Sequence, residues 1–200
     1  MSADDKALYE AVLRKSRQSV DAQQRFFETQ GEQVVACARA LARAFAAGGR
    51  LFAFGNGGSA CDAEHLAVEF AHPIVEKRRA LPAVALGGQS ALLTAIGNDQ
   101  DFALAYAREL ASLARPGDVA VGISTSGKSR NVVRALKAAR ELGMLRVGLT
   151  GKDGGALIAE CEHLFVVDSF SIHRIQEVHG ALLHVLWDLV HVALGEEDVL

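Results

Sequence analysis

The sequence predicts an α/β protein in which helices cover both faces of a parallel sheet. Half of its 200 residues are apolar, which is enough for one large core. Five short, continuous apolar runs have the length of buried strands, and most are separated by amphipathic stretches such as SRNVVRALKAARELG. Short apolar strands that alternate with helices are typical of a parallel sheet with both faces buried.

The first 47 residues are predicted to be helical. They contain no proline and no glycine before Gly31, and their apolar residues recur at helical spacing. We expect two helices, the second of which ends at Gly48 and Gly49, a typical stop signal. Because such helices would expose an apolar face on a monomer, residues 1–47 are assigned to oligomerisation and residues 48–200 to the α/β domain.

The strands and a closing helix follow in order along the rest of the chain. Strands are predicted at residues 51–54, 83–86, 119–123, 146–149 and 164–167, and a long final helix at 174–194. In an open sheet of this class, ligands bind beyond the carboxyl ends of the strands, where loops lead into helices. Four stretches meet that condition: GNGGSACDAEH, GND, STSGKS and TGKDGG.

Charge and composition argue against several classes of function. A net charge of -3 gives no electrostatic footprint for nucleic acid, and the basic residues Lys77, Arg78 and Arg79 are expected to lie in a solvated loop. The three cysteines form no disulfide framework and MSADDKALYE is not a signal peptide, so we expect a reduced, cytoplasmic protein. Histidine and aspartate interrupt the longest apolar runs, which excludes a membrane partner.

Two loops rich in glycine and serine are candidate phosphate sites. The glycines of FGNGGS allow the backbone to approach an anion at a helix N-terminus, although a tight turn alone would also need them. In STSGKS, four hydroxyls stand where a single one would suffice as an ordinary N-cap. Together with backbone N–H groups, these hydroxyls can hold the oxygens of a phosphate monoester.

The second loop also matches the P-loop pattern, because residues 122–129 read GISTSGKS. A nucleoside triphosphatase needs in addition an acidic residue at a strand end to hold Mg²⁺, and Asp168 at the end of LFVVD would provide it. This interpretation leaves the other glycine-rich loop, GND and the polar side chains of the helices without a role. The triphosphatase is therefore the last of the candidate functions.

Polar side chains on two helices indicate chemistry beside these loops. His65 and Glu69 are four residues apart and share one helix face, and the final helix carries Gln176, His179 and His184. A lone histidine is more often a surface or core residue. Two polar helical sites beside phosphate-binding loops predict either an acid–base pair for proton transfer or a metal site of histidine and glutamate. Spacing alone does not choose between His179 and His184.

The motifs FGNGGSACDAEHLAVE, AIGND, GISTSGKSRNV, LTGKDGG and RIQEVHGALLH resemble, in that order, those of the sugar isomerase (SIS) domain family and, within it, the phosphoheptose isomerases. The resemblance covers residues from about 50 to 194. It implies a three-layer αβα SIS fold with a five-stranded, flavodoxin-like parallel sheet, and a homotetramer. It also implies an aldose–ketose isomerase that converts sedoheptulose 7-phosphate to D-glycero-D-manno-heptose 7-phosphate through an enediol, at the start of nucleotide-activated heptose and lipopolysaccharide synthesis.

The resemblance further implies roles for individual residues. Glu69 is similar to the base that removes the carbon-bound proton, and His184 to its partner acid/base. The Zn²⁺ ligands of the family are matched by His65, Glu69, Gln176 and His184. Its substrate contacts are matched by Asn56, Gly57, Gly58, Ser59, Glu69, Asn98, Asp99, Ser124, Thr125, Ser126, Ser129 and Gln176. Lys128 matches no catalytic residue, so the P-loop spelling is interpreted as a coincidence over a phosphate site.

Two positions depart from the family pattern. Pro73 stands where heptose isomerases commonly carry arginine, and His173 where some carry aspartate. Either Arg78, Arg79 or His72 substitutes for the arginine, or the pocket accepts a different sugar phosphate.

Two further functions compete within the same family. One is a non-catalytic adaptor resembling the replication-initiation regulator that binds the initiator protein. Relatives of that kind lack the carboxylate and imidazole, so Glu69 and His184 favour an enzyme. The other is a sugar-phosphate-sensing regulator, which would carry a DNA-binding domain for which 200 residues leave no room.

Overall fold

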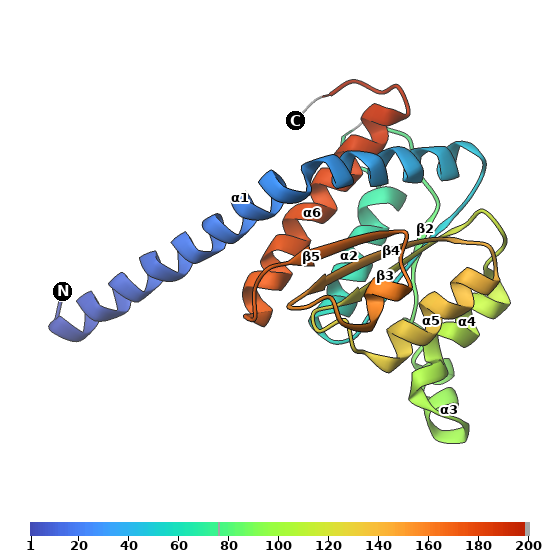
Figure 1. Cartoon of the computed structure of the whole chain (residues 1–200), viewed down its shortest axis with the longest axis horizontal. Helices are drawn as coiled ribbons and strands as arrows, with labels where there is room; N and C mark the ends of the chain where they lie inside the picture. Colours follow the sequence, from blue (N-terminus) through green and yellow to red (C-terminus); the bar gives the residue numbers. More distant parts are fainter. Residues whose placement is uncertain (76, 199–200) are drawn as a thin grey trace.

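The computed structural model describes residues 1–75 and 77–198 (Figure 1). The elements in chain order are α1 (Ala3–Ala46), β1 (Leu51–Gly55), α2 (Gly58–Ala71), β2 (Ala83–Ala85), α3 (Ser90–Asp99), η1 (Phe102–Leu104), α4 (Ala105–Leu113), β3 (Val119–Ser124), α5 (Arg130–Glu141), β4 (Leu145–Gly151), η2 (Gly155–Ala159), β5 (His163–Val167) and α6 (Ile172–Ala193). The five strands pair in parallel in the order β2-β1-β3-β4-β5, which is the flavodoxin-like order.

The sheet is the middle layer of three. Alternate side chains of β1 enter different cores: Leu51 and Ala53 pack with α1, α2 and α6, whereas Phe52 and Phe54 pack with α4 and α5. Every residue of β1 and β3 is buried, as expected for central strands that are covered on both faces. The predicted fold class is confirmed, and the observed strands lie at the five predicted runs.

The prediction of two N-terminal helices is wrong, because α1 is one continuous helix of 44 residues. Gly31 does not interrupt it, and a Cβ at that position would meet nothing within 4 Å. A glycine inside a helix costs only about 1 kcal/mol. Phe26, Val34 and Leu41 pack from α1 into the main core and outweigh that cost. The helix ends where predicted, just before Gly48, whose φ is +85°.

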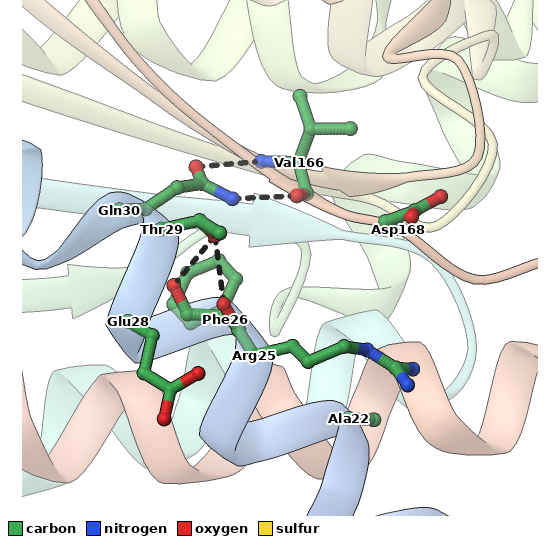
Figure 2. Close-up of a pocket in the computed structure, with 8 residues that line it drawn as sticks. All are labelled: Ala22, Arg25, Phe26, Glu28, Thr29, Gln30, Val166 and Asp168. Atoms are coloured by element: carbon green, nitrogen blue, oxygen red, sulfur yellow. Dashed lines mark hydrogen bonds between the residues drawn. The ribbon is translucent and has the colours of Figure 1, made fainter.

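The second half of α1 also covers the free edge of the sheet. Gln30 Nε2 donates to the carbonyl of Val166 on β5 (2.6 Å) (Figure 2). Gln33 Nε2 donates to the carbonyl of Leu164 (2.9 Å). Gln30 Oε1 in turn accepts from the Val166 N–H (3.3 Å). Side-chain amides thus take the place of a neighbouring strand along an edge that would otherwise be open to pairing.

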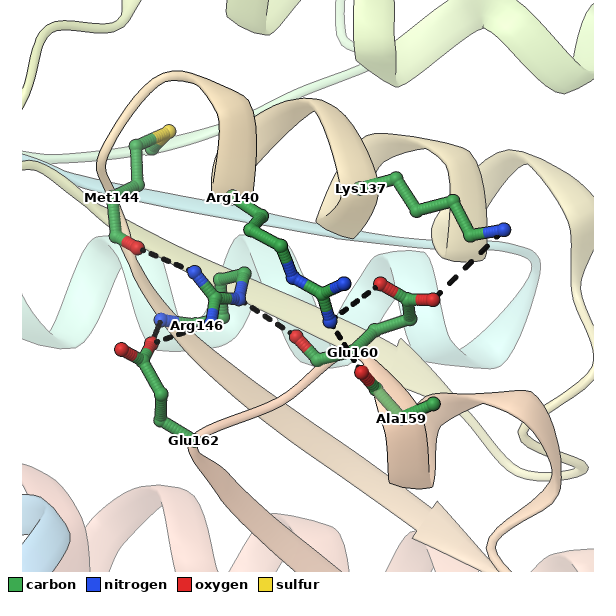
Figure 3. A network of polar contacts seen from close by, with 7 residues as sticks. All are labelled: Lys137, Arg140, Met144, Arg146, Ala159, Glu160 and Glu162. Atoms are coloured by element: carbon green, nitrogen blue, oxygen red, sulfur yellow. Dashed lines mark hydrogen bonds and ion pairs between the residues drawn. The ribbon is translucent and has the colours of Figure 1, made fainter.

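Polar contacts tie α5 to the chain around η2 and the start of β4. Glu160, which is buried, forms an ion pair with Arg140 (3.0 Å) and lies 3.9 Å from Lys137 (Figure 3). Arg146 donates to the Glu160 carbonyl (2.8 Å) and pairs with Glu162 (3.5 Å). This network fixes the end of the sheet opposite the carboxyl ends of the strands.

The chain leaves the carboxyl ends of β1 and β3 in opposite directions. β1 leads into α2 on the face covered by α1 and α6, and β3 leads into α5 on the other face (Figure 1). In open α/β sheets, the crevice at such a switch point is where ligands bind. Among the described residues, no helix is long and apolar enough to cross a membrane.

Candidate active site

The loop between β1 and α2 contains three glycines, and each position requires glycine for a different structural reason. A Cβ on Gly55 would lie 2.5 Å from the carbonyl oxygen of Ser59, and a Cβ on Gly58 would lie 2.2 Å from Nε2 of Gln176. Gly57 has a φ of +56° and is the N-cap of α2, which has no side-chain cap. The turn therefore needs its glycines, and it also brings the Gln176 carboxamide from α6 to the open start of α2.

The loop between β3 and α5 gathers the predicted hydroxyls. Ser124 is buried at the end of β3, and its Oγ lies 2.9 Å from Oγ of Ser129. Ser129 occupies the N-cap position of α5 but makes no side-chain cap hydrogen bond, so the ordinary N-cap interpretation does not describe it. Ser126 Oγ accepts from the Lys128 N–H (3.2 Å). These hydroxyls line a turn at a helix N-terminus, an arrangement suited to an anion.

A cluster of His65, Glu69 and His184 lies between α2 and α6. Glu69 Oε1 is 3.1 Å from Nε2 of His65 and 4.0 Å from Nδ1 of His184. The two imidazole rings meet edge to face at 4.8 Å, and the three ligand atoms all lie within 4.8 Å of one another. Glu69 is half-buried and His184 is exposed. The cluster can transfer protons to a bound molecule or hold a metal ion.

The structure separates the two histidines that spacing left open. His179 is completely buried, and its Nε2 lies 3.1 Å from the carbonyl oxygen of Thr150. Burial lowers the pKa of His179 to about 4. His184, five residues further along α6, is the one that joins His65 and Glu69.

Three polar residues near the site were missed by the sequence analysis. Asp62 is one turn before His65 on α2, and burial raises its pKa to about 6 against the lowering effect of His65. Asn131 on α5 and Tyr106 on α4 both contact Asn56 in the first loop. The helical spacing of Asp62 and His65 was a usable signal, whereas nothing local marked Asn131 or Tyr106.

Asn98 and Asp99 end α3, just before the segment Asp101 to Ala103, which lines a pocket with Asn56 and Ser129 of the two loops. Both are exposed at the end of α3, where Asn98 Nδ2 donates to Asp99 Oδ1 (2.7 Å). In Figure 1, α3 lies on the outer side of α4 and α5. Their predicted contact with substrate stays a prediction.

The expectation of a solvated basic loop is wrong for Arg78. Its side chain is only 2% exposed; it forms an ion pair with Asp188 and stacks 4.5 Å over the ring of Trp187. Arg79 pairs with Glu196 (3.5 Å). The ion pair and the stacking hold Arg78 against α6.

Lys128 and Asp168, the residues that a P-loop triphosphatase would need, lie apart and have other neighbours. Lys128 Nζ lies 3.3 Å from Asp153 Oδ2, and both side chains are exposed. Asp168, the candidate Mg²⁺ ligand, lines a pocket against α1 together with Arg25 and Glu28 (Figure 2). β5 is separated from β3 by β4.

The fold and this site define an α/β protein with two open helix N-termini at the switch point of its sheet, an arrangement suited to an anion, and a cluster of two histidines and a glutamate. Residues 16–151 match the SIS domain family. The chain is 43% identical over 186 residues to the phosphoheptose isomerase of Roseiflexus sp., covering 93% of this chain and 94% of that protein. Among solved structures, the phosphoheptose isomerase of Neisseria gonorrhoeae superposes with a TM-score of 0.86 at 39% identity, covering 92% of this chain and 98% of that one. The phosphoheptose isomerase of Francisella tularensis gives 0.87 at 30% identity, with 96% and 100% covered.

The chain therefore belongs to the SIS domain family and, within it, to the phosphoheptose isomerases. This membership confirms the predicted enzyme class, a sugar-phosphate isomerase.

Proposed function

We propose that this chain converts sedoheptulose 7-phosphate to D-glycero-D-manno-heptose 7-phosphate, the first step towards a nucleotide-activated heptose. The observation that carries the proposal is a carboxylate between two imidazoles, placed beside two loops that open onto helix N-termini at the switch point of the sheet. A ketose-to-aldose shift needs a base for a carbon-bound proton, an acid for the oxygens and an anchor for the remote phosphate. The names of the relatives support the same reaction.

Glu69 is the base in this scheme. Its carboxylate removes the proton from the carbon next to the ketone, which leaves an enediol, and returns the proton to the former carbonyl carbon. His184, whose Nδ1 is 4.0 Å from Glu69, moves protons on and off the two oxygens from its exposed position. The serines of the β3–α5 loop and the N-termini of α2 and α5 hold the phosphate, which keeps the reacting carbons at the cluster.

The donor set fits Zn²⁺. Two imidazole nitrogens and one carboxylate oxygen within 4.8 Å of one another are the ligand types of many catalytic zinc sites. His65, Glu69 and His184 would hold the ion, with Gln176 as a fourth donor. Bound Zn²⁺ would act as a Lewis acid that stabilises the oxyanion developing on the substrate.

Metal analysis of protein purified without chelator tests this ligand set. His65→Ala is expected to lose most of the zinc, and Gln176→Ala less, because a neutral carboxamide is the poorest of the four donors. His163→Ala, on the distant strand β5, is the control and should keep the metal. Full zinc content in His65→Ala would contradict the assignment.

The reaction itself is tested by incubating the protein with sedoheptulose 7-phosphate and identifying the product by NMR. We expect the aldose 7-phosphate to appear. A parallel incubation with fructose 6-phosphate, a shorter ketose phosphate, serves as the comparison. The adaptor function is not favoured, since the carboxylate and imidazoles that such relatives lack are assembled here. An unchanged ketose spectrum with folded, metal-loaded protein would reject the proposed reaction.

A further inference from the structure

The two loops proposed to bind the anion follow neighbouring strands of the sheet, but the pairing of these strands stops where the loops begin. Backbone pairing of β1 with β3 ends at Gly55 and Ile123. Beyond that point the chain turns towards α2 on one face and towards α5 on the other. A phosphate that both loops bind needs them at one fixed separation, because misplacing a binding group even slightly weakens its contribution.

A pair of side-chain amides bridges this gap. Asn56 Nδ2 donates to Asn131 Oδ1 (2.9 Å), and Asn131 Nδ2 donates back to Asn56 Oδ1 (2.7 Å). Asn56 follows β1, whereas Asn131 lies in the first turn of α5. Asn131 is only 3% exposed, and its Oδ1 also accepts the N–H of Val132 (3.0 Å). The amide of Asn131 is therefore hydrogen-bonded both to the backbone of α5 and to Asn56 in the β1–α2 loop.

Tyr106 supports the pair from α4. Its hydroxyl donates to the carbonyl oxygen of Gly55, the last residue of β1, and lies 3.3 Å from Asn56 Oδ1. Its ring stacks on Phe54 with centroids 5.4 Å apart, which fixes where the hydroxyl can point. Asn56, Asn131 and Ser129 also line one surface pocket, so the pair lies directly beside the phosphate cradle.

We propose that Asn131 is a positioning residue that holds the β1–α2 loop and the β3–α5 loop at the separation that binds one phosphate. This rests on the proposed function. Asn131 acts through Asn56 rather than on the substrate, and Tyr106 keeps Asn56 in place. A neutral amide suits this role because it both donates and accepts, and because it adds no negative charge beside a phosphate dianion.

Asn131→Asp is the sharpest test, since it keeps the size and both acceptor contacts but loses the donor to Asn56 and adds a charge. We expect KM for sedoheptulose 7-phosphate to rise about tenfold or more while kcat changes by less than about threefold, the signature of lost uniform binding. The dissociation constant of inorganic phosphate, measured by calorimetry, should rise in parallel. Tyr106→Phe keeps the ring and adds no charge, so the smaller rise of both constants that we expect for it reports lost positioning and not repulsion between a carboxylate and the phosphate.

Asp118→Asn is the matched control. Asp118 is also 3% exposed and accepts backbone N–H groups of Arg50 and Arg115, but it lies just before β3, at the opposite end of that strand. It should lower the melting temperature and leave both constants unchanged. If Asn131 had a purely structural role, Asn131→Asp would likewise lower the melting temperature and leave both constants unchanged. That result would overturn the proposal.

The two readouts separate this inference from the proposed function. If wild-type protein does not isomerise sedoheptulose 7-phosphate, the proposed reaction fails, yet binding of inorganic phosphate still decides the role of Asn131. If Asn131→Asp does not fold, Tyr106→Phe decides it: weaker phosphate binding supports the positioning role, and wild-type binding rejects it.

Discussion

Ser124 and Lys128 stand four residues apart in the same loop but are expected to differ in importance. Ser124 is buried against Ser129, whereas Lys128 is 65% exposed and faces Asp153. A P-loop lysine matters only where a β- or γ-phosphate is bound. We expect Lys128→Asn to keep isomerase activity within a small factor, and Ser124→Ala or Ser126→Ala to raise KM. Steady-state kinetics check this, and an inactive but folded Lys128→Asn would show that the lysine was wrongly dismissed.

Buried His179 makes stability depend on pH in a defined direction. Its pKa is about 4 in the folded protein and about 6.5 in an unfolded chain. The unfolded state thus binds the proton more tightly, so this stability is complete above about pH 6.5 and is lost as the pH falls towards 4. At pH 5 the loss is about 2 kcal/mol.

Urea unfolding at pH 7 and pH 5 measures the effect. His179→Gln keeps a donor for the Thr150 carbonyl but does not titrate, so its stability should fall less between the two pH values than that of the wild type. His173→Gln, which replaces an exposed histidine on the same helix, should behave like the wild type. If the free energy of unfolding changed equally with pH in all three proteins, protonation of His179 would not be the cause of the loss of stability.

Individual residues were predictable where their partners are local in sequence. His65 and Glu69 are four apart on one helix, so their contact followed from spacing, and the family resemblance added His184. Arg78 was misjudged because its partner Asp188 lies 110 residues away. The Asn56–Asn131 pair spans 75 residues, and no local pattern reports a contact of that length.

At the scale of elements, the strands were predictable because each is a short apolar run with a glycine or helix beside it. The length of α1 was not predictable, because a glycine within a helical pattern suggests that the helix ends there unless the packing of that helix is known. The position of α1 along the edge of β5 could not be predicted either, because the sequence does not indicate whether a glutamine on a helix faces a strand or solvent.

The glutamines of α1 give a prediction for this element. Gln30→Leu leaves the peptide group of Val166 without its side-chain partner, which should lower the free energy of unfolding by about 1–3 kcal/mol. Gln24→Leu changes an exposed glutamine that bonds only within α1, to Glu28, and should cost much less. Denaturant unfolding at fixed protein concentration compares them. Equal costs would mean that the edge contacts of Gln30 contribute nothing to stability.

For the whole molecule, the first half of α1 projects from the body (Figure 1). This half carries exposed apolar side chains. Leu8, Tyr9, Val12 and Val20 are among them. We expect a homotetramer held partly by this helix, because closed symmetric assemblies cover such faces. Light scattering should show the tetramer, and Val12→Glu should weaken it more than Lys6→Glu. A stable, fully active monomer at high dilution would reject this assembly.

Glu69 is proposed to take the proton from the sugar carbon, and hydrogen exchange with solvent measures that step. Sedoheptulose 7-phosphate is incubated in D₂O with wild-type protein and with Glu69→Gln, and deuterium at the carbons around the carbonyl is followed by NMR. The variant keeps the size of the side chain but lacks the basic carboxylate, so its exchange should be about 10² to 10⁴ times slower. Calorimetry should show that it still binds the sugar phosphate. Exchange at the wild-type rate in a variant that binds substrate would contradict the role of Glu69 as the base and assign the proton transfer to another group.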